Sequence, residues 1–212
     1  MGRSAAVVVA AGGGHRFGAP KQFETLAGSR LVDRAVAAAA DACDEVVVVL
    51  PAGVDWDGPP VAAAVRGGAR RADSVRAGLA AVSEDCDVVV VHDAARPLAP
   101  PSLFTDVIAA VRGGADGAVP ALPLTDTVKR VADGRVVDTP SREALVAVQT
   151  PQAFRADVLR AAHAGGGDAT DDAALVEAYG GTVVIVPGDR ANLKVTAAAD
   201  LLVADALLAH ER

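Results

Sequence analysis

Five apolar runs of strand length recur along the chain and set the strongest limit on its fold. The apolar residues within each run are continuous, which is typical of parallel strands buried on both faces. The runs span residues 5–10, 45–50, 87–92, 117–122 and 182–186. Helix-compatible segments alternate with them at residues 31–42, 73–82, 101–112, 156–164, 171–179 and 197–210. This alternation predicts an α/β fold with a doubly wound, mostly parallel sheet flanked by helices.

The length of the chain favours one folding unit. A chain of 212 residues fits one α/β domain, so we expect residues 1–212 to form a single domain. The hydrophobic fraction of 51% excludes disorder, and no apolar run reaches the roughly 18 residues needed to span a bilayer. The first strand follows Ser4 directly, which leaves no room for a signal peptide. We therefore expect no membrane partner and a cytoplasmic location.

Charge and composition exclude several function classes. A net charge of −7 and an aromatic content of 3% argue against a nucleic-acid partner, which needs clustered cations and stacking rings. The two cysteines, Cys43 and Cys86, are far apart and suggest neither a disulfide framework nor a zinc site. We expect both to be buried thiols.

One segment departs from the strand and helix alternation. Residues 127–132 and 135–139 flank Asp133-Gly134, a dipeptide that favours a two-residue hairpin turn. Two strands alone are marginally stable in water, so the hairpin must pack on the body or on another subunit. We predict a dimerisation arm at about residues 123–143 that protrudes from the sheet.

The first apolar run leads into a glycine-rich turn. Gly12, Gly13 and Gly14 follow the strand, and Arg16 and Lys21 come next. Glycines let the backbone approach an anion closely, and fixed cations add charge, so this turn predicts a phosphate site.

Two common nucleotide motifs do not fit this turn. A dinucleotide fingerprint needs a third glycine where Phe17 stands, and a Walker loop needs Lys-Ser or Lys-Thr where Ala19-Pro20 follows Gly18. An oxidoreductase that uses NAD is therefore the weakest interpretation.

Other polar clusters follow the predicted strands. They lie at residues 67–74, 92–97, 149–152 and 192–196. In open α/β sheets, ligands bind beyond the carboxyl ends of the strands, so these clusters predict one site together with the glycine turn. We interpret His92 as a structural residue, because no carboxylate–histidine metal spacing surrounds it.

The chain resembles the 2-C-methyl-D-erythritol 4-phosphate cytidylyltransferases of the non-mevalonate isoprenoid pathway over nearly its full length. The resemblance rests on seven motifs that occur in order. They are AAGGGHRFGAPKQF at 10–23, GGARRADSVRAGL at 67–79, HDAARP at 92–97, LPLTDTVKR at 122–130, QTPQAF at 149–154, TDDAALVE at 170–177 and NLKVT at 192–196. The family implies a Rossmann-like nucleotidyltransferase fold with a projecting β-hairpin arm, a homodimer, Mg²⁺ and CTP.

The resemblance assigns the CTP side of the site. By this resemblance, the CTP phosphates would be wrapped by the turn residues Ala10, Ala11, Gly12, Gly13 and Gly14. Arg16 and Lys21 would stabilise charge in the transition state, whereas Gly68 and Ser74 would contact the cytosine and ribose. The chain departs from its relatives in a short Gly18–Lys21 segment and in Ala69, where many relatives carry an acidic residue.

The resemblance also assigns the acceptor side. Asp93 would lie near Mg²⁺, directly or indirectly, and near the sugar phosphate, with Arg96 in the same motif. Thr127 and Arg142 would reach the acceptor of the neighbouring subunit. Thr150 and Lys194 complete the pocket, and Lys194 positions the attacking phosphate. Arg16, Lys21, Arg142 and Lys194 are thus the expected catalytic residues.

The implied reaction is transfer of CMP from CTP to 2-C-methyl-D-erythritol 4-phosphate. The acceptor phosphate attacks the α-phosphate of CTP directly, giving 4-diphosphocytidyl-2-C-methyl-D-erythritol and pyrophosphate. A cytidylyltransferase for ribitol 5-phosphate or a similar polyol phosphate is a close alternative, because the motifs distinguish polyol phosphates poorly. A non-catalytic nucleotide-binding protein is an alternative of another class.

Overall fold

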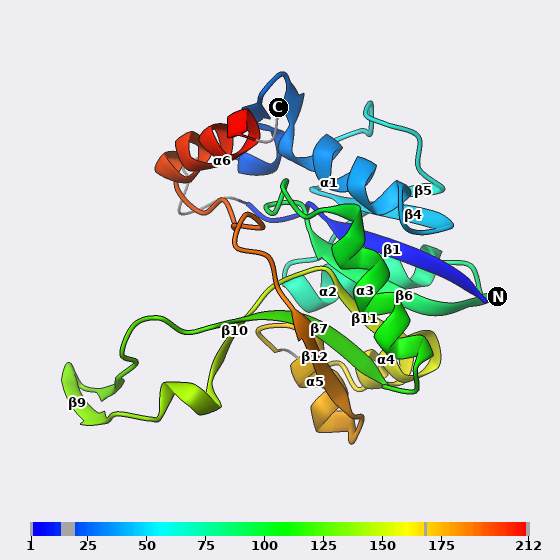
Figure 1. Ribbon diagram of the computed structural model, residues 1–212. Coiled ribbons are helices and arrows are strands. Elements are labelled where there is room, and N and C mark those ends of the chain that lie inside the picture. Colours follow the sequence, from blue (N-terminus) through cyan, green and yellow to red (C-terminus); the bar gives the residue numbers. More distant parts are fainter. Residues whose placement is uncertain (1, 14–19, 168, 211–212) are drawn as a thin grey trace.

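The computed structural model describes residues 2–13, 20–167 and 169–210, which form a central sheet covered by helices on both faces (Figure 1). The sheet strands are β1 (Arg3–Val9), β4 (Glu45–Leu50), β5 (Ala63–Arg66), β6 (Cys86–Asp93), β7 (Gly117–Pro123), β10 (Val146–Val148), β11 (Gln152–Arg155) and β12 (Val183–Pro187). The helices are α1 (Leu31–Ala40), α2 (Arg71–Ala81), α3 (Pro101–Arg112), α4 (Ala156–Ala164), α5 (Asp172–Tyr179) and α6 (Ala198–His210). Among the described residues, no helix has the length and apolar character that a bilayer crossing requires.

The sheet is mostly parallel, as predicted. Its order is β10-β7-β11-β6-β1-β4-β5, and β12 pairs with β7. β1 lies between β4 and β6 and is parallel to both, and the β4–β5 and β7–β12 pairs are also parallel. β11 is antiparallel to β6 and β7, between which it lies. The carboxyl ends of β1 and β6 therefore meet at one edge of the sheet.

The apolar runs predicted the long strands, but the shorter strands were missed. β11 is only four residues long and begins with Gln152, a polar residue whose side chain is buried and hydrogen-bonded. β5 alternates between half-buried and exposed residues, as an outer strand does. β11 shows no continuous apolar run, so hydrophobic patterning could not identify it, whereas β5 lies in the short apolar run 61–65, which is mostly alanine and was not recognised as a strand.

Burial on both faces explains the continuous apolar character of the strands. Along β1, Ala6 and Val8 pack in a cluster with α1 and α3. The alternating residues Ala5 and Val7 pack in a second cluster with α2, α4 and α5. Because successive side chains of a strand point to opposite faces, both sets must be apolar.

The predicted hairpin is present and stands apart from the main sheet (Figure 1). It consists of β8 (Arg130–Ala132) and β9 (Arg135–Asp138), which pair antiparallel. Asp133 and Gly134 have φ angles of 48° and 72°, the two positive values that a type I′ turn requires. Three valines of the hairpin are largely exposed, with exposed fractions of 63%, 60% and 57% for Val131, Val136 and Val137.

The two cysteines differ in burial. Cys86 is buried as expected, whereas Cys43 is only partly buried, so the expectation of two buried thiols is wrong for Cys43. Desolvation nevertheless raises the pKa of Cys43 to about 12, which keeps this thiol protonated at neutral pH.

His92 is a buried structural residue near the end of β6, as expected. Its ring lies 5.0 Å from the ring of Phe104 and is fully inaccessible to solvent. Nε2 donates to the carbonyl oxygen of Arg96 at 3.1 Å, and Nδ1 lies 3.2 Å from the Thr150 hydroxyl, which can donate to it. Burial lowers the pKa of His92 to about 4, so the ring is neutral at pH 7.

The buried ring predicts a loss of stability in mild acid. Between pH about 6.5 and about 4, His92 is protonated in the unfolded chain and neutral in the folded one. The unfolded state then binds more protons, so the free energy of unfolding falls as the pH falls through this window. From pH 7 to pH 5, we expect His92 to account for a loss on the order of 2 kcal/mol.

Urea unfolding at both pH values would measure this contribution. In His92→Gln, which keeps a donor for the Arg96 carbonyl but cannot titrate, the loss should shrink by that amount. An equal loss in both proteins would show that His92 does not cause it.

Candidate active site

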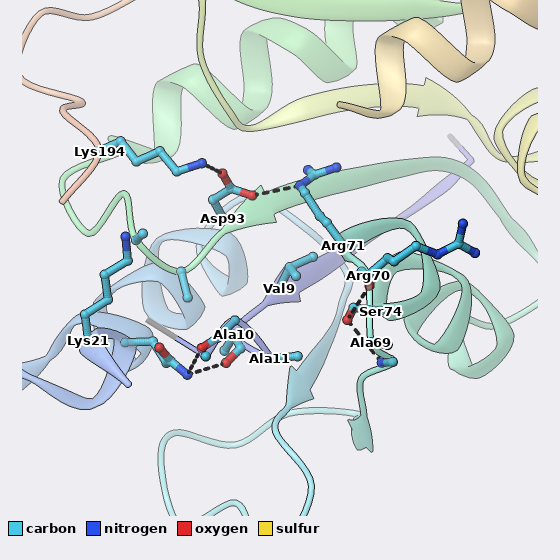
Figure 2. A pocket seen from close by; sticks show the side chains of 16 residues that line it. Val9, Ala10, Ala11, Lys21, Ala69, Arg70, Arg71, Ser74, Asp93 and Lys194 are labelled. Carbon is cyan, nitrogen blue, oxygen red and sulfur yellow. Dashed lines mark hydrogen bonds and ion pairs between the residues drawn. The ribbon is translucent and has the colours of Figure 1, made fainter. Parts of the chain in front are cut away.

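A pocket of about 390 Å³ opens at the carboxyl ends of β1 and β6, beside the start of α2. This volume lies within the usual range for small-molecule sites, about 300–1,000 Å³. Figure 2 shows side chains from several separate segments pointing into it. The predicted site residues that line it are Ala10, Ala11, Gly12, Gly13, Lys21, Gly68, Ser74, Asp93 and Lys194. The structure thus brings together segments that span most of the chain.

The glycine turn forms one wall of the pocket. Gln22, in the short 3₁₀ helix η1 (Lys21–Phe23), donates from Nε2 to the carbonyl oxygens of Ala10 at 2.7 Å and Gly12 at 3.1 Å. A Cβ atom at Gly12 would meet nothing within 4 Å, so the packing of the protein does not require glycine there. The absence of a side chain at Gly12 instead leaves open space in the pocket beside the backbone. The predicted contacts at Gly14 and Arg16 lie outside the described residues.

Gly68 and Ser74 form a second wall, next to the glycine turn. The Gly68 N–H donates to the Ser74 hydroxyl at 3.2 Å, and this hydroxyl donates to the carbonyl oxygen of Arg70, also at 3.2 Å (Figure 2). A Cβ atom at Gly68 would collide with that of Asp73, so only glycine fits this turn. Ala69, the departure from the family pattern, also lines this wall.

Asp93 lies at the end of β6 between two cations (Figure 2). Oδ2 accepts from Nζ of Lys194 at 2.6 Å, and Oδ1 lies 3.3 Å from Nε of Arg71. The residue is only 8% exposed. Burial alone would raise the pKa of Asp93, but the attraction of Arg71 and Lys194 outweighs burial and holds this pKa well below its usual range. The carboxylate is therefore ionised at neutral pH.

The segment that carries Lys194 is held by a buried polar network. Nη1 of Arg96 donates to the carbonyl oxygen of Asn192 at 2.7 Å, and Nδ2 of Asn192 donates to the carbonyl oxygen of Thr150 at 2.9 Å. Gln149 also donates to the Asn192 carbonyl oxygen, at 3.2 Å. These bonds join the ends of three segments, so the reach of Lys194 toward Asp93 depends on all of them.

Two predicted site residues lie behind the pocket rather than in its wall. The Thr150 hydroxyl is buried and accepts from the Asp93 backbone N–H at 3.0 Å. Arg96 contacts the Asn192 carbonyl oxygen, as described above, and burial lowers its pKa. In this structure, both residues hold the segments that carry Asp93 and Lys194.

Thr127 and Arg142 lie in and beside the hairpin arm, and neither is among the residues that line the pocket. Both are exposed. Arg142 begins the 3₁₀ helix η2 (Arg142–Ala144), and its Nη1 donates to the carbonyl oxygen of Thr125 at 2.6 Å. The hairpin extends away from the body of the same chain (Figure 1), and the pocket that Lys194 lines includes neither Thr127 nor Arg142.

Sequence reasoning assigned no role to Gln22 or Arg71. Gln22 directly follows Lys21, and Arg71 lies in the quoted motif beside Gly68. Nothing in the local pattern shows that a glutamine braces a turn, or that an arginine reaches a carboxylate 22 positions away. The only indication of a role for Gln22 or Arg71 in the sequence was its position within a quoted motif.

The side chains around Asp93 could hold Mg²⁺ only together with oxygen atoms from a bound substrate and from water. Within the described ranges, no three His, Cys, Asp or Glu side chains gather as a metal site. Mg²⁺ is commonly held by one or two carboxylates, several waters and substrate phosphates rather than by an all-protein cage. Asp93 is suited to such an arrangement, because it is an ionised carboxylate on the pocket wall.

Comparison with known proteins places the chain among its relatives. The family model described as 2-C-methyl-D-erythritol 4-phosphate cytidylyltransferase matches residues 4–210. Two proteins of that name, from Frankia casuarinae and Nocardia farcinica, are 49% and 48% identical to the chain. Each alignment covers 98% of this chain, and the alignments cover 82% and 94% of the relatives, respectively.

A solved structure agrees with the sequence comparison. The crystal structure of 2-C-methyl-D-erythritol 4-phosphate cytidylyltransferase from Thermus thermophilus superposes with a TM-score of 0.83 at 38% identity. The match covers 99% of this chain and 100% of that one. The chain therefore belongs to the 2-C-methyl-D-erythritol 4-phosphate cytidylyltransferase family.

Proposed function

We propose that this protein transfers CMP from CTP to 2-C-methyl-D-erythritol 4-phosphate and releases pyrophosphate. The observation that carries the proposal is a pocket in which a glycine turn faces Lys21, Lys194 and the paired carboxylate Asp93. Membership of the family supports both the nucleotide and the acceptor. The pocket lies beyond the carboxyl ends of parallel strands, where α/β sheets usually bind ligands.

The chemistry needs little activation of the nucleophile. The second pKa of a phosphate monoester is about 6, so the acceptor phosphate is already ionised at neutral pH. An oxygen of this phosphate forms a bond to the α-phosphorus of CTP while the bond to the pyrophosphate oxygen breaks, and the electron pair leaves with pyrophosphate. No protein nucleophile is required. The main barrier is to bring two anions together, which is the work of positioned cations.

The pocket residues divide this work. We assign the triphosphate to the glycine turn Ala10–Gly13 and to Lys21, and the cytidine to the wall of Gly68 and Ser74. The acceptor phosphate belongs beside Lys194. The ammonium group of Lys194 can leave its ion pair with Asp93 and bind the incoming phosphate instead. Gly14 and Arg16 would extend the triphosphate side, as the family pattern implies.

The remaining features of the family follow as parts of the proposal. Asp93 would hold Mg²⁺ together with the substrate phosphates, and the ion would supply neutralisation of their charge. The exposed valines of the arm support a homodimer, because a two-stranded ribbon with apolar side chains in water is not stable alone. Thr127 and Arg142 would then reach the partner's pocket. We place the enzyme in the cytoplasm and treat residues 1–212 as one domain with its dimerisation arm.

A direct assay tests the substrate. With CTP, Mg²⁺ and 2-C-methyl-D-erythritol 4-phosphate, purified protein should release pyrophosphate and form the diphosphocytidyl product. Ribitol 5-phosphate in the same assay should give a kcat/KM at least tenfold lower, because acceptor contacts set discrimination between substrates. A preference for ribitol 5-phosphate would overturn the acceptor assignment, and CTP binding without turnover of any polyol phosphate would favour the non-catalytic alternative.

Removal of either pocket lysine should abolish most turnover. Lys21→Ala and Lys194→Ala each remove a cation that stabilises developing charge, so we expect kcat to fall about a hundred- to thousandfold. Both variants should remain folded at the assay temperature, although Lys194→Ala also removes an ion-pair partner of the buried Asp93 carboxylate and should lower the thermal unfolding midpoint. Arg155→Ala is a matched control, because it removes one positive charge at the end of β11 that lies outside the pocket. A lysine variant that turns over as fast as this control would reject that lysine's role.

Subunit mixing tests whether Arg142 acts across the dimer. Lys21→Ala and Arg142→Ala should each be nearly inactive as homodimers. In a mixed dimer, one site combines an intact Lys21 with the intact Arg142 of the other chain. An equal mixture at exchange equilibrium should therefore regain about a quarter of wild-type activity. No recovery, with subunit exchange shown by native mass spectrometry, would contradict a contribution in trans.

A further inference from the structure

A buried carboxylate outside the pocket contacts Arg71, a residue of the pocket wall, and through it reaches Asp93. Asp172 is the first residue of α5, and its side chain is 1% exposed. Oδ2 accepts from Nη1 of Arg71 at 2.7 Å, and Oδ1 lies 3.0 Å from Nε2 of His163. Because an ionised carboxylate can only accept, His163 donates to it through Nε2. Asp172 thus joins α5 both to α2 and to α4.

Arg71 joins this buried group to the pocket. Its Nε faces Asp93 at 3.3 Å, while its Nη1 contacts Asp172 (Figure 2 shows the Asp93 side of this bridge). Its Nη2 is buried and has no hydrogen-bond partner within the described part of the chain. The position of the guanidinium group therefore depends on two carboxylates from different elements, β6 and α5.

The two contacts differ in quality. The bond to Asp172 is short and fully buried on the carboxylate side, whereas the contact to Asp93 is long for a charge-assisted hydrogen bond. Asp172 thus determines where the guanidinium group of Arg71 lies, and Asp93 accepts only the longer contact from Nε. Burial alone would lower the pKa of Arg71, but the two carboxylates raise it and keep the group charged.

We propose that Asp172 is a positioning residue for the cytidylyl transfer, acting through Arg71 on the carboxylate of Asp93. With Arg71 held by Asp172, Oδ1 of Asp93 faces only one long contact, and Oδ2 is presented to Lys194. Without Asp172, the whole charge of Arg71 falls on Asp93, which draws this carboxylate away from Lys194 and from the acceptor side. This inference rests on the function proposed above.

The competing interpretation is that Asp172 only stabilises the packing of α4 on α5 through its contact with His163. That role would affect the unfolding temperature but would not distinguish one substrate from the other. Positioning through Asp93 should instead change the acceptor kinetics and leave nucleotide binding nearly intact, because the triphosphate and cytidine walls do not contact Asp172.

Asp172→Asn, which is nearly isosteric, tests the proposal in the full-length enzyme. We expect kcat/KM for the acceptor to fall about ten- to a hundredfold, as when an outer partner of a site ligand is removed. The dissociation constant for CTP should change by less than about threefold. Asp171→Asn is the matched control: it removes the same charge from the neighbouring residue, which caps Ala174, accepts from Gln152 and does not contact Arg71. Asparagine caps a helix about as well as aspartate, so this control should retain wild-type kinetics. Equal kinetics in both variants would overturn the proposal.

Arg71→Lys provides a second route, also in the event that Asp172→Asn does not fold. One ammonium group cannot reproduce the two donors that bridge the carboxylates, so this variant should show the same loss toward the acceptor. Adding Asp172→Asn to Arg71→Lys should lower kcat/KM by less than about twofold further, because both substitutions remove one pathway. Full activity of Arg71→Lys, or independent losses that multiply, would overturn the proposal.

The Arg71 Nη1–H signals in ¹⁵N NMR separate this inference from the proposed function, because Nη1 is the atom that contacts Asp172. In wild-type protein and in Asp171→Asn, these protons should exchange slowly with solvent, whereas in Asp172→Asn their exchange should accelerate at least tenfold. Unchanged exchange in Asp172→Asn would overturn the positioning role whatever the assay shows. The expected acceleration in a protein that turns over no acceptor would instead refute only the proposed function.

Discussion

The ion pairs of Asp93 are the interactions on which the site depends. This carboxylate ends the central strand β6, and it is held by Lys194 from the segment after β12 and by Arg71 from α2. A buried carboxylate without partners would be strongly unfavourable, so the position of Asp93 depends on these cationic partners. Asp93 thereby joins segments that lie 22 and 101 positions away in the chain. A change at any of these three positions alters the charge that the other two present to a ligand.

The sheet makes this arrangement possible. Because both faces of β1 and β6 are covered by apolar clusters, the polar residues of these strands are confined to their ends. His92, the penultimate residue of β6, follows this rule and is nevertheless buried, as a neutral ring that bonds to Arg96 and Thr150. The buried network of amide side chains and Arg96 then fixes the loops above the sheet. The pocket walls are therefore held by hydrogen bonds from buried side chains to backbone carbonyl oxygens of the loops.

Sequence patterns predicted the parts of this protein that local chemistry determines. Apolar runs located the long strands, Asp133-Gly134 located the hairpin turn, and the glycine turn with Lys21 located one wall of the pocket. β11 was missed because Gln152 replaces an apolar residue at its start, and its burial is satisfied by hydrogen bonds. The partners of Asp93 could not be predicted from spacing, because tertiary packing decides which arginine reaches it. The role of Asp172 could not be predicted either, since its contact with Arg71 also spans 101 positions.

The charge balance of the site explains how an acidic protein can bind two anionic substrates. In the described pocket region, the cations Arg71 and Lys194 are matched by Asp93 and Asp172, so this cluster carries no net charge before a ligand arrives. Lys194 is 40% exposed at its side chain, whereas the side chain of Asp172 is nearly inaccessible. An incoming phosphate can therefore compete for Lys194, but it cannot compete for the Arg71–Asp172 pair. One cation is available for exchange and the other is fixed, and this asymmetry lets Asp93 release Lys194 to a substrate without becoming an unpaired buried charge.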